Sequence, residues 1–528
     1  MNGPPGAGKS TLAPALAARL GVTSVDLDAL VAARAGMSAG ALIAARGEPA
    51  LRALEAELLD GLLRTDAACV VALGGGALTS SSLRRRALRE ARVLALHASP
   101  ETLLARIAAG APRPLVTASR DPARALRELL EARAEGYAEA HRTLSSEAHD
   151  VAALAAEAAA WASAPAPMVV PLGARSYRVY TGPVAGLGAV FGQELSPHTS
   201  CHGVTESTVA RCCAWMRPAL PEVRGAWLTL RAGEASKTLR GAERVWAHVL
   251  AQGIDRRGVL LCHGGGVISD LGGFAASALL RGVRYATVPT TLLAMLDASV
   301  GGKTAVDHRL GKNLIGAFHH PSLVWMDVEA LRTLPRREIR AGLAEAVKIA
   351  VVRDGELLQI LERDAARLAR GDDLDALRAV LVRAVRAKID VVAEDEREGG
   401  VRALLNFGHT VGHAVEAASG YRLRHGECVA IGMRAALALG ADLGVTPPAL
   451  RTRVGDLLDR LGLPARAAVD ETRAAEALGR DKKRVGETLR FVLATAAGEA
   501  SLRDVPWARA HDVLRAVIET RSTGRSRL

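Results

Sequence analysis

The sequence predicts an α/β protein in two parts, each with its own nucleotide-binding region. From about residue 12 to residue 162, short apolar runs alternate with helix-periodic stretches, which is typical of a parallel α/β domain. A glycine-rich phosphate-binding pattern opens this region at residues 3–10. From about residue 337 the apolar periodicity is almost entirely helical. The second part is therefore expected to join an α/β half to an all-helical half.

In the first part the pattern predicts three strands and two long helices. The strands are expected at residues 22–27, 69–73 and 92–96, which are short apolar runs between longer helical stretches. The helices are expected at residues 51–64 and 122–140, where apolar residues recur with helical spacing. This alternation of strand and helix favours a parallel sheet with helices on its faces.

Domain boundaries follow from composition. Ser-Ala-Pro-Ala-Pro at residues 163–167 ends a helix-forming run and precedes the strand-like residues 168–172, so a linker is predicted there. The first domain is expected to span residues 1–162. The second part is expected to divide into a strand-rich and turn-rich half, residues 168–336, and the helical half, residues 337–528.

Composition excludes several classes of protein. A chain of 528 residues is too long for one ordinary core. The net charge of +12 is spread through amphipathic segments without a Lys/Arg tract interleaved with aromatics, so nucleic-acid binding is not expected. A solvated arginine-rich surface explains this charge, and attraction of anionic small substrates is the alternative. Six cysteines form neither a CxxC pair nor a disulfide framework, and no signal peptide or membrane-spanning run is visible, so a cytoplasmic protein is expected.

The spacing from Gly3 to Lys9 and Ser10 is the P-loop pattern, in which small residues let backbone amides converge on phosphate oxygens at a helix N-terminus. Lys9 is expected to bridge the β- and γ-phosphates of ATP, and Ser10 to bind Mg²⁺. The expected nucleotide contacts are Gly6, Gly8, Lys9, Ser10 and Thr11. Only Met1 and Asn2 precede the loop, so the strand that should deliver it is expected to be missing, which we interpret as a true start lying upstream.

An ordered set of polar residues and glycines follows the P-loop. It consists of Asp26, Asp28, Arg52, the turn Gly74, Gly75 and Gly76, Arg113 and Arg133. An aspartate can orient an attacking hydroxyl, and two arginines suit a carboxylate. Order and spacing together resemble shikimate kinase over residues 1–160, with a fold like that of nucleoside monophosphate kinases.

The resemblance to shikimate kinase implies a role for each member of the set. Asp28, Arg52, Arg133 and the triglycine turn would hold shikimate, with Asp28 at the reacting hydroxyl. Asp26 would help to position Mg²⁺. Arg113 would lie on a mobile lid and reach the transferring phosphate. A different small-molecule kinase, or a P-loop module without kinase activity, is the alternative for this part of the chain.

A second chemistry is indicated by histidines in the C-terminal part. His409 and His413 are four residues apart on a predicted helix and therefore share a face, and His425 follows. Glu345 lies upstream. A Glu/His/His or a three-histidine set that leaves one coordination position open is typical of a catalytic zinc site.

The motifs around these histidines are specific. They are the Gly-Gly-Gly run at 264–266 with Asp270, Pro-Thr-Thr at 289–291, Asp297 with Gly-Gly-Lys-Thr at 301–304, Gly-Lys-Asn at 311–313, Asn-Phe-Gly-His at 406–409 and Arg-Asp-Lys-Lys at 480–483. Together they resemble 3-dehydroquinate synthase over residues 168–528. The resemblance implies Glu345, His409 and His425 as ligands of Zn²⁺ or Co²⁺, with His413 as an acid/base or phosphate contact.

The same resemblance implies two further sets of residues. Around the substrate, and in catalysis, it places Lys303, Lys348, Lys388, Arg402, Asn406, Asn313 and Arg281, the last reaching in from a second subunit of a homodimer. Around NAD⁺ it places Glu234, Lys237, Gly265, Gly266, Asp270, Thr290, Thr291, Asp297, Lys303, Lys312 and Asn313. The triglycine turn would let the backbone approach the pyrophosphate without a GxGxxG fingerprint.

The resemblance predicts a bifunctional enzyme of the shikimate pathway. The synthase would convert 3-deoxy-D-arabino-heptulosonate 7-phosphate to 3-dehydroquinate by transient oxidation, phosphate elimination, re-reduction and ring closure, regenerating NAD⁺ in each cycle. Another sugar-phosphate cyclase or a metal-dependent alcohol dehydrogenase is the alternative for this part. The number of lysines and arginines favours an anionic substrate over a simple polyol.

Overall fold

The computed structural model forms two compact units, residues 1–180 (unit 1) and residues 181–528 (unit 2). It describes residues 1–110, 113–147, 150–195, 199–479, 484–485 and 487–519. The expected linker at 163–167 lies inside unit 1, ahead of the antiparallel strands β5 (Met168–Val170) and β6 (Tyr177–Thr181), so the position of the domain boundary stays a prediction.

Unit 1 has a parallel sheet at its centre. Strand β1 (Thr23–Asp26) pairs with β2 (Cys69–Ala72), and β3 (Leu94–His97) pairs with β4 (Arg142–Ser145), both in parallel. Met1 and Asn2 lie between the two pairs.

This two-residue segment replaces a full central strand. The amide of Leu73 donates to the carbonyl of Met1 at 3.0 Å, and Asn2 forms a parallel bridge with Ala95. The predicted absence of the first strand is therefore corrected in part, because the two residues before the loop make ladder hydrogen bonds on both sides. They deliver the P-loop to the end of the sheet.

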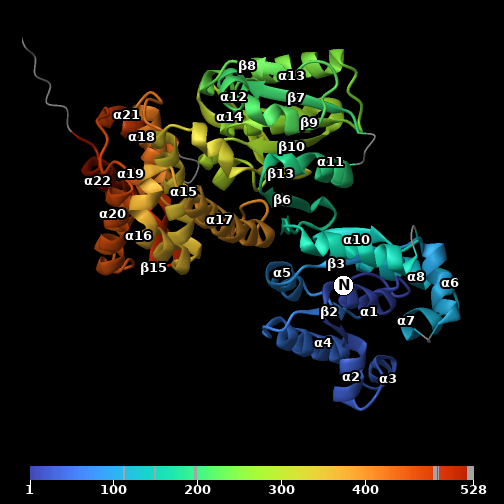
Figure 1. Ribbon diagram of the computed structural model, residues 1–528. Coiled ribbons are helices and arrows are strands. Elements are labelled where there is room, and N and C mark those ends of the chain that lie inside the picture. The colour runs from blue at the N-terminus through green and yellow to red at the C-terminus, as the bar shows by residue number, and fades with distance from the viewer. Residues whose placement is uncertain (111–112, 148–149, 196–198, 480–483, 486, 520–528) are drawn as a thin grey trace, which may run out of the picture. The chain divides into compact units, whose positions relative to one another are not determined.

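Helices surround this sheet in the alternating order that the sequence predicts (Figure 1). They are α1 (Lys9–Leu20), α2 (Leu27–Ala35), α3 (Ala39–Arg46), α4 (Glu48–Leu63), α5 (Ser81–Glu90), α6 (Pro100–Ala109), α7 (Pro114–Thr117), α8 (Pro122–Ala132), α9 (Ala134–Ala138) and α10 (Val151–Ser163). Leu12 and Leu16 of α1 are buried with Leu94 and Leu96 of β3 in one core. This core fixes the start of α1, and with it the P-loop, against the sheet.

The first half of unit 2 is a parallel sheet in the order β13-β10-β9-β7-β8. Its elements are α11 (Leu187–Leu195), β7 (Cys201–Glu206), α12 (Ser207–Cys212), β8 (Leu228–Leu230), α13 (Leu239–Ala251), β9 (Val259–Gly264), α14 (Gly266–Ala278), β10 (Arg284–Pro289), the hairpin β11 (Lys303–His308) and β12 (Gly311–Phe318), and β13 (Leu323–Met326). Helix α14 packs on β9 and β10 (Figure 1). Ligands of such sheets bind beyond the carboxyl ends of the strands, where β9 and β10 lead into Gly265 and Thr290.

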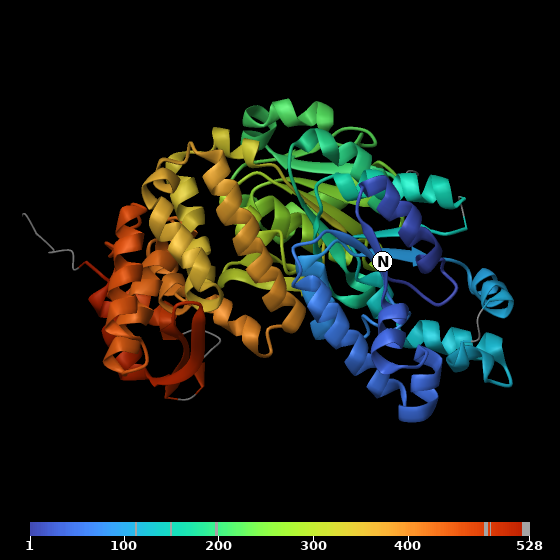
Figure 2. The same cartoon turned by 60° about the horizontal axis from the view of Figure 1, so that its bottom comes forward.

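The second half of unit 2 is a layered group of helices. They are α15 (Arg336–Arg353), α16 (Gly355–Arg370), α17 (Leu374–Glu394), α18 (His409–Ala418), α19 (His425–Asp442), α20 (Pro448–Arg460), α21 (Glu471–Gly479) and α22 (Trp507–Ala516). Helices α15, α16 and α17 pack side by side, as the yellow and orange ribbons of Figure 2 show.

The prediction of an all-helical half is corrected in one respect. Strands β14 (Arg484–Val485), β15 (Thr488–Ala496) and β16 (Glu499–Pro506) form an antiparallel sheet. Residues 488–496 combine β-branched and aromatic side chains, and Gly498, with φ 86°, allows the tight turn into β16. Helix periodicity before and after this segment concealed the hairpin.

Within the described residues, no single helix has the length and apolarity to cross a membrane. The bent pair α2 and α3 passes that test by length and composition only.

Candidate active sites

The P-loop of unit 1 has the conformation that phosphate binding requires. Gly6 and Gly8 have φ of 81° and 87°, in the left-handed region that favours glycine. Ser10 and Thr11 are exposed in the first turn of α1. Lys9 is buried, and its Nζ donates to the carbonyls of Gly3 at 2.7 Å and Pro4 at 2.9 Å.

Burial, together with the nearby guanidinium of Arg113, lowers the pKa of Lys9 to about 8. The ammonium is therefore costly to keep charged in this loop until an anion lies against it. A polyphosphate would supply that anion.

Two aspartates at the end of β1 and the start of α2 lie near Lys9 of the loop. Asp26 caps α2 by accepting hydrogen bonds from the amides of Asp28 at 2.9 Å and Ala29 at 3.3 Å. The carboxylate of Asp28 lies 3.5 Å from Nη1 of Arg113. The structure thus brings the predicted base and the predicted lid arginine together.

The two arginines predicted to hold a carboxylate already share one. Nη1 of Arg52 lies 2.5 Å from Oε2 of Glu55, and Arg52 also pairs with Glu48. Nη2 of Arg133 lies 2.9 Å from Oε1 of Glu48, the oxygen that also pairs with Arg52. Glu48 had no predicted role from the sequence, although its position four residues before Arg52 on a helix was an available signal. The convergence shows that both arginines can reach a single carboxylate.

The triglycine turn makes room for these side chains. A Cβ on Gly74 would lie 2.2 Å from Oε1 of Glu55, and a Cβ on Gly76 would lie 2.2 Å from Nη2 of Arg52. The carbonyl of Gly75 accepts a hydrogen bond from Nη1 of Arg133 at 3.1 Å. A side chain at position 74 or 76 would displace Glu55 or Arg52, so the glycines let these two side chains lie against the turn.

In unit 2, Glu345, His409 and His425 offer ligand atoms that all lie within 4.8 Å of one another. Glu345 is fully buried on α15, and neither carboxylate oxygen has a well-oriented hydrogen bond, although Lys348 forms an ion pair with it. Burial and the charge of Lys348 hold the pKa of His409 well below its ordinary value. A neutral imidazole and an unsatisfied carboxylate are what a divalent metal requires, so the donor set fits the predicted zinc.

Glycines bring the three ligand helices together. A Cβ on Gly432 of α19 would lie 1.8 Å from the carbonyl oxygen of Gly408, the residue before His409. A Cβ on Gly426, next to His425, would lie 1.8 Å from the carbonyl oxygen of Ala341 on α15. Backbone-to-backbone contact at these crossings sets the separation of the ligands.

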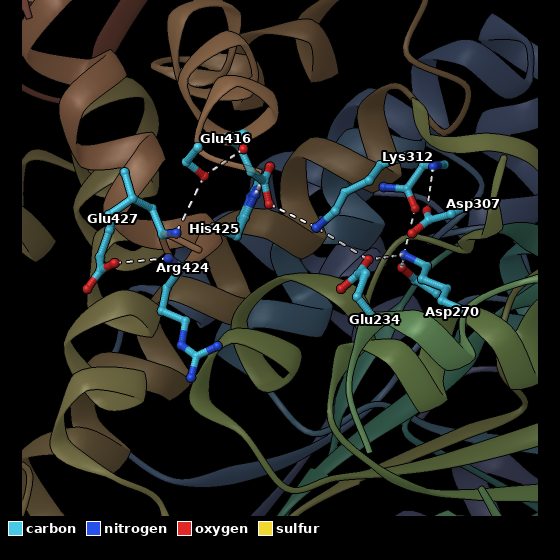
Figure 3. A network of polar contacts seen from close by, with 12 residues as sticks. Glu234, Asp270, Asp307, Lys312, Glu416, Arg424, His425 and Glu427 are labelled. Carbon is cyan, nitrogen blue, oxygen red and sulfur yellow. Dashed lines mark hydrogen bonds and ion pairs between the residues drawn. The ribbon is translucent and has the colours of Figure 1, made fainter. Parts of the chain in front are cut away.

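A buried carboxylate that the sequence analysis did not select lies behind His425. Oε2 of Glu416 is 3.3 Å from Nδ1 of His425, and Oε1 is 3.0 Å from Nζ of Lys312 (Figure 3). Burial opposes ionisation of Glu416, but the hydrogen bond and charge of His425, with the charge of Lys312, outweigh it and lower the pKa to about 2. The position of Glu416 three residues after His413 on one helix face was the available signal. His413, Glu416 and His425 also offer ligand atoms within 4.8 Å of one another.

The cations expected around the substrate lie between the two halves of unit 2. Nζ of Lys303 is 2.6 Å from Glu398, which also accepts from Asn406 at 2.7 Å. Lys388 donates to the carbonyl of Asp297 at 2.6 Å and pairs with its carboxylate.

Burial is the main cause that lowers the pKa of Lys388 to about 8. Arg402 is buried and donates to the carbonyl of Gly301 at 2.8 Å. Glu398 was not selected from the sequence, because its contact with Lys303 spans a long sequence separation.

The predicted dinucleotide residues form a connected polar network (Figure 3). Nζ of Lys237 lies 2.5 Å from Asp270 and 2.6 Å from Oδ1 of Asn313. Nζ of Lys312 lies 3.4 Å from Glu234.

Gly265 precedes the first turn of α14, which starts at Gly266, so free amides of the helix N-terminus face the end of β9. Thr291 accepts a hydrogen bond from the amide of Ala294 at 3.2 Å, whereas the buried hydroxyl of Thr290 has no partner among the described residues. An unpartnered buried hydroxyl at this strand end suits a polar ligand.

Two predicted groups are not placed in this cluster. Arg281 is exposed after α14, with a left-handed φ of 67°. The motif at 480–483 lies outside the described residues.

The fold and the two sites define a class of protein: a P-loop small-molecule kinase followed by a metal-dependent enzyme with a dinucleotide-type sheet and a cluster of lysines and arginines suited to an anionic substrate. Family models agree with this division. The model of shikimate kinase matches residues 5–162, and those of the N-terminal and C-terminal domains of 3-dehydroquinate synthase match residues 227–341 and 342–484.

Curated relatives carry the family assignment. 3-Dehydroquinate synthase from Synechococcus is 43% identical over 361 residues, which cover 66% of this chain and 98% of that protein. The one from Symbiobacterium thermophilum is 44% identical over 336 residues, covering 62% of this chain and 94% of that protein. The chain therefore belongs to the 3-dehydroquinate synthase family and carries a shikimate kinase domain before it, which makes it a bifunctional enzyme of the shikimate pathway.

Solved structures of other sugar-phosphate cyclases are also similar. 2-epi-5-epi-Valiolone synthase from Streptomyces hygroscopicus, solved with NAD⁺ and Zn²⁺, has a TM-score of 0.59 and 30% identity over 65% of this chain and 96% of its own. 2-Deoxy-scyllo-inosose synthase, solved with NAD⁺ and Co²⁺, has a TM-score of 0.59 and 25% identity over 65% and 97%. Because these identities are lower than those to the dehydroquinate synthases, the alternative cyclase activities are not favoured.

Proposed function

We propose that unit 1 phosphorylates shikimate with ATP and Mg²⁺, and that unit 2 converts 3-deoxy-D-arabino-heptulosonate 7-phosphate to 3-dehydroquinate with NAD⁺ and Zn²⁺ or Co²⁺. The observation that carries the second assignment is the Glu345, His409 and His425 cluster beside the buried cations Lys348 and Lys388. The structural relatives solved with NAD⁺ and Zn²⁺ or Co²⁺ support the same cofactors here.

In the kinase, positioning and charge neutralisation carry most of the catalysis. The P-loop amides and Lys9 hold the β- and γ-phosphates, while Ser10 and Asp26 place Mg²⁺. Arg52 and Arg133 leave Glu48 to bind the substrate carboxylate, and Asp28 orients the attacking hydroxyl. Arg113, now 3.5 Å from Asp28, is within reach of the phosphate that is transferred.

In the synthase, Glu345, His409 and His425 hold the metal, which supplies Lewis acidity to the hydroxyl that is oxidised. Lys348 pairs with Glu345 and would bind the substrate beside the metal ligands. His413 is exposed on α18 with its ring centroid 5.9 Å from that of His425, and it would act as the phosphate contact or proton carrier.

The remaining cations fix the substrate's two anionic ends. They are Lys303, Lys388 and Arg402, with Asn406 and Asn313 as neutral donors. Each is held in the structure by a carboxylate or a carbonyl, so none has to move far to pair with phosphate or carboxylate. A simple polyol has no anion that could take the place of these internal partners, so it would not use the cations, which argues against an alcohol dehydrogenase.

In this proposal the residues at the ends of β9 and β10 would hold NAD⁺. Gly265 and Gly266 would contact its pyrophosphate, and the remaining polar contacts would be Glu234, Lys237, Asp270, Thr290, Thr291, Asp297 and Lys312. A homodimer would bring Arg281 into the site of the second subunit. The soluble metabolic domains and the cysteine content support a cytoplasmic location for the enzyme.

Separate inactivation of the two sites tests the proposal. Lys9→Ala should abolish shikimate-dependent ADP formation and leave phosphate release from the heptulosonate phosphate unchanged. His409→Ala should do the reverse. If wild type shows no shikimate-dependent ADP formation, the kinase assignment is wrong, and if phosphate release survives His409→Ala, the metal assignment is wrong.

A further inference from the structure

One buried carboxylate is shared between the metal cluster and the dinucleotide network. Glu416 lies on α18, and its two oxygens point in different directions (Figure 3). One oxygen is 3.3 Å from Nδ1 of His425 and the other is 3.0 Å from Nζ of Lys312. The side chain is only 6% exposed, so water does not replace either partner easily.

The two partners of Glu416 contact residues of two different sites. Nε2 of His425 lies 3.7 Å from Oε1 of Glu345, inside the proposed metal cluster. Nζ of Lys312 lies 3.4 Å from Glu234, which is itself 4.0 Å from Lys237. The network of contacts therefore connects a proposed metal ligand to residues that are proposed to bind the dinucleotide.

We propose that Glu416 is a positioning residue that couples occupancy of the metal site to occupancy of the dinucleotide site. The inference rests on the proposed roles of His425 and Lys312. A cation at Nε2 of His425 makes the opposite N–H a stronger donor and draws Glu416 toward the imidazole. That shift releases Lys312.

Lys312 completes the coupling from the other side. The phosphates of a dinucleotide attract its ammonium, which frees the charge of Glu416 for His425. The dinucleotide thus removes one of two competitors for the carboxylate, and the metal strengthens the other. Both ligands should therefore bind more tightly together than alone, by the same factor in either order.

Zinc affinity, measured by competition with a chromophoric chelator with and without saturating NAD⁺, tests the coupling without relying on turnover. In the wild type NAD⁺ should tighten zinc binding about tenfold, within the usual range of coupling between sites. Glu416→Gln keeps the size of the side chain but removes its charge. It should weaken zinc binding roughly 10–100-fold, as loss of an outer-shell partner does, and bring the NAD⁺ effect close to onefold.

A second variant acts in the opposite direction. Lys312→Met leaves Glu416 to His425 alone, so zinc should bind at least as tightly as in the NAD⁺-free wild type, with no further gain from NAD⁺. The matched control is Glu427→Gln, which removes a carboxylate from the first turn of α19, the helix that begins at His425. Glu427 pairs with Arg337 at 2.6 Å, so this variant should keep the wild-type coupling factor.

The outcomes separate the inference from the proposed function. Wild-type coupling in Glu416→Gln, or no NAD⁺ effect in the wild type, overturns the inference. An unchanged NAD⁺ affinity in Lys312→Met overturns the assignment of Lys312 to the dinucleotide. The inference is supported if NAD⁺ no longer tightens zinc binding in either Glu416→Gln or Lys312→Met, while zinc affinity falls in the first variant and is kept or raised in the second.

Discussion

Addition of a single methyl group at Gly432 is predicted to damage the metal site. It lies on α19, where that helix crosses the start of α18, and a Cβ there would lie 1.8 Å from the carbonyl oxygen of Gly408 and 2.7 Å from the amide of Gly412. Backbone, not a flexible side chain, opposes the methyl group. In Gly432→Ala the two helices must therefore separate.

The size of the effect follows from that distance. Real Cβ contacts stop at 3.0 Å, so relief requires a displacement of about 1.2 Å. His409 directly follows Gly408 and moves with it, whereas metal sites tolerate only about 0.2 Å in ligand distance. Overpacking should cost roughly 1–3 kcal/mol of stability. A misplacement of this size should lower kcat/KM of the synthase about 100-fold.

Zinc content after dialysis, thermal unfolding and phosphate release from the heptulosonate phosphate measure these effects. Gly455→Ala is the matched control, because Gly455 lies inside α20 and its added Cβ meets only Arg434 at 3.7 Å. That control should be neutral or up to about 1 kcal/mol more stable, since alanine favours helix. A Gly432→Ala enzyme with wild-type zinc content and phosphate release would refute the role of the glycine crossing.

Three further predictions concern both units. Because the pKa of Lys9 is about 8 when the loop is empty and an anion raises it, ATP binding should take up a proton and weaken as pH rises above about 8. Titration calorimetry should show this loss in the wild type and not in Lys9→Arg, whose side chain stays charged. Gly76→Ala, with a Cβ 2.2 Å from Arg52, should raise KM for shikimate more than tenfold in a steady-state assay and leave KM for ATP nearly unchanged. Removal of the unit 2 metal by a zinc-selective chelator, with Mg²⁺ kept in excess, should lower the melting temperature of unit 2 and leave ADP formation unchanged, and zinc at about 1,000 times its Kd should restore about 4 kcal/mol.

The sequence was sufficient for features whose partners lie close along the chain. The P-loop is continuous, and His409 and His413 share a helix face by spacing alone. The metal set of Glu345, His409 and His425 needed the family resemblance, because Glu345 comes from a distant helix. The structure then brought the three together.

Features that depend on tertiary contacts were not predictable from spacing. Glu398 approaches Lys303 across a separation of 95 residues, and an isolated glutamate in a polar loop gives no local sign of such a contact. The segment Met1–Asn2 acts as a strand only because the chain next to β2 and strand β3 lie on either side of it and form hydrogen bonds with it. Local periodicity does not contain either fact.

The carboxylates that the sequence analysis missed share one physical role. Glu48, Glu398 and Glu416 each neutralise cations that are proposed to bind an anionic substrate or cofactor. A buried or half-buried cation without a counter-charge would lose its proton or destabilise the fold.

Pairing keeps these side chains charged and oriented while the site is empty, and the incoming phosphate or carboxylate exchanges with the internal partner. The binding free energy of the incoming anion is therefore the difference between two ion pairs, the one that the cation forms with the anion and the one that it forms with the internal glutamate. The anion binds favourably only where its contacts with the cation are better than those of the glutamate. Selectivity for the correct substrate thus rests on geometry more than on charge alone.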